Sequence, residues 1–137
     1  MDRAFTYQPH IQEIPNIRED LAFLKQEWGI SDSEIRQILV IIEELFSNIL
    51  RYAFEGQQKY PVDIRLGRSE GQIEIEIIDD GMPFNPLEYQ TGPLSDPASS
   101  DAGGMGLTLI RAFSSSVSYQ RDSGKNHLKI IKTLKGK

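Results

Sequence analysis

Residues 62–80, VDIRLGRSEGQIEIEIIDD, contain the pattern that decides the fold. Two runs within it, 62–66 and 73–77, alternate apolar and polar side chains, and a short turn at 68–71 separates them. Alternation with a period of two residues is typical of strands that bury one face, so the stretch predicts an antiparallel hairpin. Glu74 and Glu76 fall on the polar side of the second run. We therefore expect a sheet with one solvated face and one covered face.

Two helices are predicted before the hairpin. The first extends from Pro15 to Trp28, where apolar residues recur at helical spacing. The second extends from Ser31 to about Phe54, and Ser31 and Glu34 form an S-x-x-E capping box at its start. Its apolar positions form one wide stripe, which indicates a helix that packs on a core.

The remaining elements complete a single domain over residues 1–137. A short edge strand is predicted at 2–8, a third helix at about 106–113, and two closing strands near 117–121 and 128–134. Strands that are paired in hairpins cannot form an all-parallel sheet. The expected fold is α+β, a two-layer sandwich in which a mostly antiparallel mixed sheet carries helices on one face.

Composition narrows the function classes. The chain has 137 residues, 20 acidic and 15 basic side chains, a formal net charge of −5 and no cysteine. Nucleic acid is not expected as a partner, because binding it requires clustered Lys and Arg. The lack of cysteine excludes a disulfide scaffold and a thiolate metal site. No signal peptide and no stretch of about 20 apolar residues is present, so a cytoplasmic protein without a membrane partner is expected.

The first of three motifs that could carry chemistry is EELFSN, residues 43–48, near the end of the second predicted helix. At ~100° per residue, Glu44 and Asn48 lie about 40° apart on one side of the helix, whereas Glu43 lies about 140° from Asn48. An Asn carbonyl is a suitable ligand for Mg²⁺, and a carboxylate one turn away could accept a proton from an attacking hydroxyl. The alternative is an ordinary solvated helix face.

The second motif is IIDDGMPF, residues 77–84, in which a strand leads directly into two carboxylates and a glycine. A carboxylate at a strand end can accept a hydrogen bond from an exocyclic amine such as adenine N6. Gly81 has no Cβ, so a flat ring could approach the backbone there. The alternative is a plain Asp-Gly turn.

The third motif is GGMGL, residues 103–107, at the start of the third predicted helix. Glycines before a helix let backbone N–H groups meet phosphate oxygens, and the helix dipole attracts anions. The alternative is a flexible hinge. Taken in order, the three motifs are far more specific than any one of them.

With these motifs the sequence resembles the GHKL ATPase superfamily, whose members have the Bergerat ATP-binding fold. Within it, the chain is similar to the anti-sigma factor serine/threonine-protein kinase branch over about residues 10–134. The resemblance implies ATP and Mg²⁺ as cofactors. It implies that Asn48 ligates Mg²⁺, that Glu44 is the general base, and that Asp79 binds the adenine amine. It implies nucleotide-binding roles for four further residues, Gly81, Gly104, Gly106 and Leu107, and an ATP lid at about 85–102.

Some positions depart from the family pattern. Pro83 replaces the last glycine of the second motif, and Tyr52 stands where the branch often has a histidine. Residues 125–128, KNHL, replace a more usual Gly-Thr pair before the last strand, which leaves Asn126 as the substitute for a threonine that would contact the phosphates.

The resemblance implies transfer of the γ-phosphoryl group of ATP to a Ser or Thr of a STAS-domain anti-sigma factor antagonist. It also implies sequestration of a sigma factor or similar regulator, and it suggests a homodimer. One alternative is an ATP-binding regulatory module without phosphotransfer, which the departures at Tyr52 and Pro83 and the missing threonine favour. Another is a histidine-kinase catalytic fragment, but His10 and His127 lack the helical-hairpin setting of a phosphoacceptor. A metal hydrolase is less favoured still, because two isolated histidines cannot form the usual clustered ligand sets.

Overall fold

The computed structural model describes residues 2–54, 59–88 and 107–135. Within these ranges, five strands form one sheet in the order β1-β2-β3-β5-β4, and all four pairings are antiparallel. The strands are β1 (Asp2–Tyr7), β2 (Val62–Ser69), β3 (Gln72–Asp79), β4 (Ser116–Asp122) and β5 (Lys125–Thr133). The first strand lies at one edge of the sheet, as its sequence predicts, and no parallel pairing occurs among the five.

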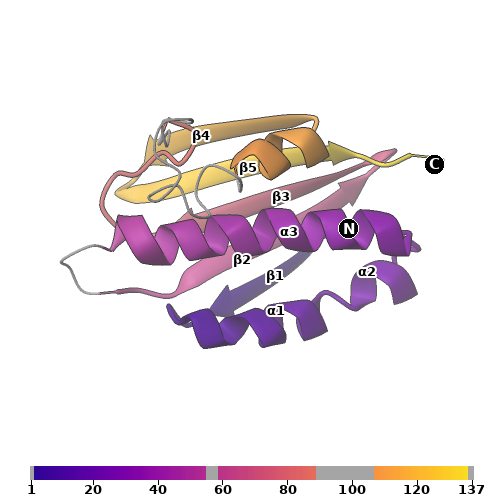
Figure 1. Cartoon of the computed structure of the whole chain (residues 1–137), viewed down its shortest axis with the longest axis horizontal. Helices are drawn as coiled ribbons and strands as arrows, with labels where there is room; N and C mark the ends of the chain where they lie inside the picture. The colour runs from indigo at the N-terminus through magenta and orange to yellow at the C-terminus, as the bar shows by residue number, and fades with distance from the viewer. Residues whose placement is uncertain (1, 55–58, 89–106, 136–137) are drawn as a thin grey trace.

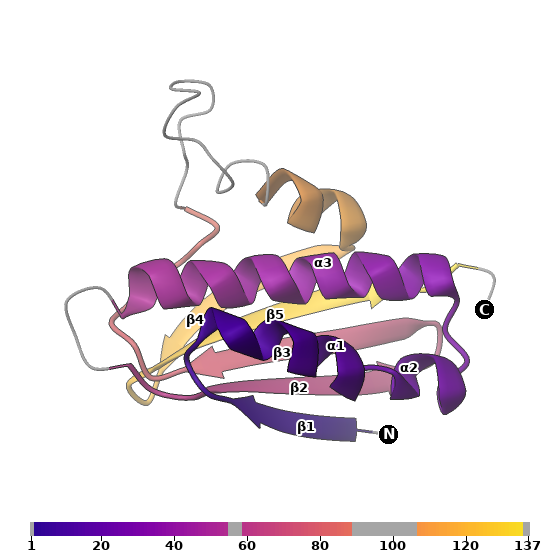
Figure 2. The same cartoon turned by 60° about the horizontal axis from the view of Figure 1, so that its bottom comes forward.

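The helices all lie on one face of this sheet (Figures 1 and 2). The longest, α3 (Asp32–Asn48), crosses the middle of the sheet and continues into a π-helical turn, η2 (Ile49–Ala53). Figure 1 shows α1 (Ile14–Asp20) on one side of it and the helical residues 107–113 on the other. The α+β sandwich predicted from the sequence is confirmed.

The first predicted helix is divided into shorter pieces, which is a difference from the continuous helix expected over 15–28. A 3-10 turn, η1 (Ile11–Glu13), precedes α1, and α2 (Phe23–Gln26) follows it after a break at Leu21 and Ala22. Hydrogen bonds of 3-10 type span the break, from the N–H of Ala22 to the carbonyl of Glu19 at 3.2 Å. The apolar spacing predicts the buried face correctly, because a 3-10 turn still brings residues three or four apart onto one side.

The start of α3 is capped by Ser31 as predicted, and the Ser31 hydroxyl also donates to Glu34 Oε1 at 3.3 Å. The Ser31 side chain accepts a hydrogen bond from the N–H of Glu34 at 3.2 Å. The buried Glu34 carboxylate accepts the backbone N–H of Lys135 at 2.8 Å. The capping acid therefore fastens the end of the last strand to the start of the central helix.

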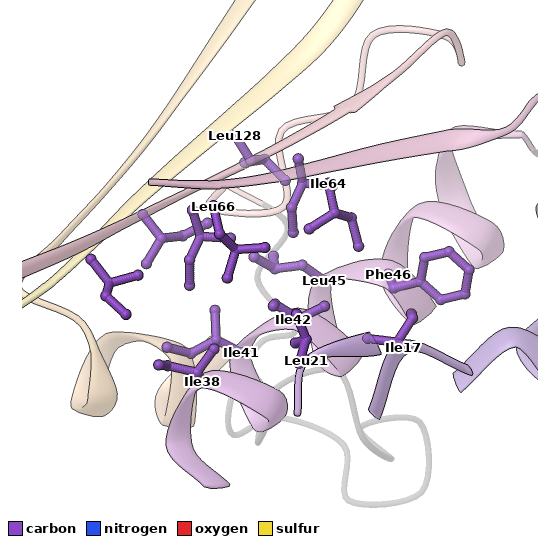
Figure 3. Packing of buried hydrophobic residues seen from close by; sticks show 14 of the residues in the cluster. Ile17, Leu21, Ile38, Ile41, Ile42, Leu45, Phe46, Ile64, Leu66 and Leu128 are labelled. Atoms are coloured by element: carbon purple, nitrogen blue, oxygen red, sulfur yellow. The ribbon is translucent and has the colours of Figure 1, made fainter. Parts of the chain in front are cut away.

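A single apolar core fills the space between α3 and the sheet (Figure 3). Figure 3 shows Leu45 and Ile42 of α3 facing Ile64 and Leu66 of β2. The other face of the sheet is solvated, as the alternation predicts: Glu74 lies 3.3 Å from Lys129, and Glu76 lies 3.5 Å from the His127 ring nitrogen Nδ1. In the described parts of the chain, no helix has the length and apolar character needed to cross a bilayer.

Candidate functional site

The third strand ends in a buried carboxylate. Asp79 is the last residue of β3 and is only 2% exposed. Its Oδ1 atom accepts two hydrogen bonds, from the Gly81 N–H at 2.8 Å and from Asn126 Nδ2 at 2.9 Å. Within the described residues, no donor reaches Oδ2. One oxygen is therefore satisfied by the protein, and the other can accept a hydrogen bond from a ligand.

The loop after Asp79 is packed against the end of the central helix. The Met82 N–H donates to the carbonyl of Ala53, in η2, at 2.9 Å. A Cβ built on Gly81 would lie 2.6 Å from that same carbonyl oxygen. The glycine is thus required by the close approach of the helix end, which is a different reason from the flat ring considered on sequence grounds. Both chain segments meet at the left of Figures 1 and 2.

Burial dominates the electrostatics of Asp79. It raises the pKa of that carboxyl above its ordinary value, and the negative charge of Asp80 acts in the same direction. The hydrogen bonds from Asn126 and Gly81 and the positive charge of Arg121 oppose the increase. Removal of a carboxylate from water favours its neutral form, whereas N–H donors favour the anion. The donors thus offset part of the cost of keeping an acceptor in a buried position.

Asn126 lies at the bottom of this site, directly across the sheet from Asp79 in the register of β3 and β5. The family resemblance makes it at most a substitute for a phosphate-contacting threonine. The structure instead joins it to Asp79, Met82 and Phe84. Two of its neighbours on β4, Tyr119 and Arg121, also donate to it and were not singled out from the sequence. Only the strand register brings them to Asp79, so spacing along the chain gives no sign of them.

The two adjacent glutamates of the first motif have different surroundings. Glu43 receives two hydrogen bonds from Arg18, at 2.7 and 2.9 Å, across the contact between α1 and α3. Glu44 has no hydrogen bond or ion pair with any described residue. Burial is the largest influence on its carboxyl and raises the pKa; Glu43 also raises it, while Arg51 lowers it. Glu44 is therefore the glutamate available to accept a proton.

Asn48 is one helical turn beyond Glu44, as the sequence predicts. It is 9% exposed, and its side chain makes no hydrogen bond within the part of the chain that the structure describes. No fully buried side-chain nitrogen or oxygen of the described residues lacks a hydrogen-bond partner, so the polar atoms of this amide are open to solvent. Its carbonyl oxygen is consequently available to a ligand or cation at this end of α3.

An aromatic contact connects the π-helical turn that follows the first motif to the last residue of the second motif. The Tyr52 ring in η2 lies 5.4 Å from the Phe84 ring, measured between centroids. Two residues of the third motif, Gly104 and Gly106, lie outside the described residues. Residues 89–102 of the expected lid also lie outside them. Leu107 is the first described residue of the following helix and is half-buried. The structure thus packs the turn that follows the first motif against the second motif, and it leaves the roles of Gly104, Gly106 and Leu107 as predictions.

The donor set suits a cation held together with phosphate oxygens. The described residues contain no cluster of three or more His, Cys, Asp or Glu side chains that could hold a metal. Mg²⁺ commonly takes only one or two protein oxygens and completes its shell with phosphates and water. A single Asn48 carbonyl fits that pattern and does not fit a metal bound by protein alone.

An antiparallel sheet with helices on one face, and a polar site where the central helix and β3 end together, is the architecture of a nucleotide-binding domain of the histidine kinase-like type. The chain belongs to this family, because residues 8–132 match the histidine kinase-like ATPase domain.

Similar proteins narrow the class further. The serine/threonine-protein kinase BtrW of Bordetella bronchiseptica is 30% identical over 107 residues, which span 77% of this chain and 73% of that protein. The serine-protein kinase RsbW of Bacillus licheniformis is 29% identical over 113 residues, spanning 79% of this chain and 71% of that protein. These relatives confirm the predicted branch and, with it, the enzyme class of protein serine/threonine kinase.

A solved structure shares the fold. The SiaB–SiaC complex from Pseudomonas aeruginosa contains a chain that matches with a TM-score of 0.65 and 19% identity, covering 94% of this chain and 88% of that one. At this identity, the similarity concerns the fold alone.

Proposed function

We propose that this kinase binds Mg-ATP between the ends of α3 and β3 and transfers the γ-phosphoryl group to a Ser or Thr hydroxyl of a STAS-domain anti-sigma factor antagonist. The observation that supports this most directly is the pair formed by Glu44 and Asn48. They are one turn apart on α3, and neither side chain has a partner among the described residues. Most polar groups of low exposure have a hydrogen-bond partner, and a ligand would provide the missing one for Asn48.

Each side chain then has a distinct task. Asp79 Oδ2 accepts a hydrogen bond from the adenine amine, while Oδ1 remains bound to Gly81 and Asn126. The Asn48 carbonyl provides the protein ligand for Mg²⁺, which offsets the charge of the phosphates when bound. Gly104, Gly106 and Leu107 are proposed to hold the phosphates at the start of the helix, with residues 85–102 as the lid.

Glu44 is the catalytic residue of this proposal. As the hydroxyl oxygen of the acceptor forms its bond to the γ-phosphorus, the bond from that phosphorus to the β–γ bridging oxygen breaks. The hydroxyl proton moves to the Glu44 carboxylate. A raised pKa makes that carboxylate a stronger base, and proton acceptors work best with pKa values near the operating pH. In such transfers, the enzyme mostly positions groups and neutralises charge.

The partners follow from the branch to which the chain belongs. The antagonist is the phosphoacceptor, and a sigma factor or similar regulator is the protein held by the kinase. A homodimer is part of the same proposal. The chain's acidic balance, with a net charge of −5, is unsuited to nucleic acid as a further partner.

A second candidate is an ATP-binding regulatory module that performs no phosphotransfer. One observation favours it: Asn126 uses its two amide protons on Asp79 and Met82, at 2.9 Å each, so it offers no donor to a phosphate. Replacement of a phosphate-contacting threonine by this residue would leave binding intact and weaken the transfer step.

A labelling experiment separates the two candidates. The purified chain is incubated with Mg²⁺, γ-labelled ATP and a purified STAS-domain antagonist, and ATP binding is measured in parallel by calorimetry. Label on a serine or threonine of the antagonist supports the kinase. Binding of ATP without transfer supports the regulatory module, and absence of both binding and transfer overturns the proposed site.

A further inference from the structure

The side-chain amide of Asn126 has a fixed orientation. The residue is 1% exposed, and its Nδ2 donates to Asp79 Oδ1 and to the carbonyl of Met82. Its Oδ1 accepts from the Phe84 N–H at 3.2 Å, from Arg121 Nη1 at 3.1 Å and from the Tyr119 hydroxyl. A backbone N–H and a guanidinium can only donate. A flipped amide would direct its NH₂ group at both of them, so the network determines which end faces Asp79.

This orientation constrains Asp79 in turn. Its Oδ1 receives N–H donors from Asn126 and Gly81, so a proton on Oδ1 would face two donors and have no acceptor. Oδ1 is therefore an acceptor only, and the carboxylate cannot rotate without losing both bonds. The remaining oxygen, Oδ2, is left in one position as a second acceptor. An acceptor in that position suits a base that presents an N–H group and disfavours one that presents an oxygen.

From these contacts we infer that Asn126 is a positioning residue that determines the base selectivity of the site. Its hydrogen bond keeps Asp79 Oδ2 available as an acceptor, which favours a purine that has an exocyclic amine. This inference rests on the proposed nucleotide site and adds to it a determinant outside the three motifs. The residue acts through Asp79 and touches no substrate itself.

The pH dependence of binding follows from the groups around Asp79. These are Asp80 in the loop, Arg121 and Tyr119 on β4, and Lys125, whose ammonium group lies 2.8 Å from Asp80 Oδ1. In the native chain, Asp79 must be ionised to accept from a base, so ATP affinity falls as the pH is lowered. Asn126→Asp places a second carboxylate against Oδ1, and the two acids then need one shared proton to keep their contact. In that variant, affinity should fall as the pH is raised.

The test measures dissociation constants for Mg-ATP and Mg-inosine triphosphate from pH 5.5 to 8.5, by calorimetry. Inosine triphosphate has an oxygen where adenine has its exocyclic amine. The matched control is Asn16→Asp, which adds the same charge at an exposed site on α1. We expect the control to follow the native profile, and Asn126→Asp to show the opposite slope with pH. Thermal melting of each variant at each pH monitors folding.

A second variant remains informative if the charge variant folds poorly. Asn126→Ala removes the hydrogen bond that positions Asp79. The preference for ATP over inosine triphosphate should then decrease about tenfold, because one hydrogen bond to a charged group contributes free energy of that size. Both ligands are measured on the same protein, so loss of folded material cancels in the ratio. An unchanged ratio together with a native-like pH slope in Asn126→Asp would overturn the inference while native ATP binding stands. Failure of the native chain to bind ATP would overturn the proposed site, and the inference with it.

Discussion

Arg18 and Glu43 are joined by two hydrogen bonds of 2.7 and 2.9 Å that connect α1 to α3. The next residue, Glu44, lacks such a partner within the described residues, and burial raises the pKa of its carboxyl. The contact with Arg18 thus gives Glu43 a structural role and leaves Glu44 as the glutamate to which we assign the proposed chemistry. The helical angle to Asn48 predicts the same preference from the sequence alone.

The first prediction concerns these two glutamates. Glu44→Gln should reduce the rate of phosphoryl transfer by about 10²–10⁴-fold, the usual contribution of a positioned base. ATP affinity should change little, because the proposed adenine contact is at Asp79. The measurement is single-turnover transfer of label to the antagonist, with ATP binding measured separately.

Glu43→Gln is the matched control. It removes the same charge one residue earlier and weakens an exposed contact with Arg18, whose side chain is 59% exposed. Surface pairs of this kind contribute little to stability, so transfer should remain near the native rate. Equal losses in the two variants would refute the assignment of the base to Glu44.

The second prediction separates binding from stability at Asp79. Because burial raises its pKa above the ordinary value of 3.8, the folded state holds the proton more tightly than the unfolded state. The stability that Asp79 contributes is thus fully present below about pH 3.8, and it is lost as the pH rises through the raised pKa of the folded state. At pH 7, the melting temperature of Asp79→Asn should therefore equal or exceed that of the native chain. The difference between the two melting temperatures should become smaller towards pH 4. ATP affinity should nevertheless fall at least tenfold.

Asp80→Asn provides the comparison for that variant. Asp80 is exposed and pairs with Lys125, so its substitution should leave both the melting temperature and ATP affinity near native values. Full ATP affinity in Asp79→Asn would show that the buried carboxylate does not contact the base.

The third prediction tests the contact between the loop and the helix end. A Cβ on Gly81 would lie 2.6 Å from the Ala53 carbonyl and 2.9 Å from its Cβ, and neither atom can move without shifting η2. Gly81→Ala should lower the free energy of unfolding by about 1–3 kcal/mol, as overpacking does. Chemical denaturation measures this change.

Gly67→Ala is the control for added volume. Its Cβ would lie 2.9 Å from Asp2 Oδ1, which is the far end of a side chain on the edge strand and not a backbone atom. Its effect should stay within about 0.5 kcal/mol. If both variants lost the same stability, the close approach at Ala53 would not be the cause.

The sequence predicts the layers of the fold and the two motifs on α3 and β3, because each depends on local periodicity. Burial of Ile17, Leu21 and Leu24 follows from their spacing even though the helix is broken at Leu21. The partners of Asp79 do not follow in this way. Asn126 meets Asp79 only because β3 and β5 pair in one register, and a shift of a single residue would place it on the other face.

Lys132 is a second case that the sequence does not reveal. It belongs to a lysine-rich end of the chain, yet it is 5% exposed. Its Nζ donates to Gln37 Oε1 on α3 at 2.5 Å and to the Phe113 carbonyl, at the end of the helical residues 107–113, at 3.1 Å. One ammonium group thus connects β5, the central helix and the helix that follows the third motif.

The last prediction follows from this burial. Desolvation is the largest influence on Lys132 and lowers its pKa below the ordinary value of 10.5, aided by Lys135 and opposed by Glu34. At pH values between the lowered pKa of the folded state and 10.5, the unfolded chain binds more protons than the folded chain. The titration of Lys132 therefore makes the free energy of unfolding increase as the pH rises. Lys132→Met removes this contribution. Its melting temperature relative to the native chain should therefore decline as the pH is raised from 7 to 10.

Lys129→Met is the appropriate comparison, because it removes an equal charge from β5 at an exposed position paired with Glu74. Its difference from the native chain should vary less with pH than that of Lys132→Met. Native and Lys132→Met curves that run parallel across this range would mean that the buried ammonium keeps its proton throughout. In that event, the contacts with Gln37 and Phe113 would suffice to offset its desolvation.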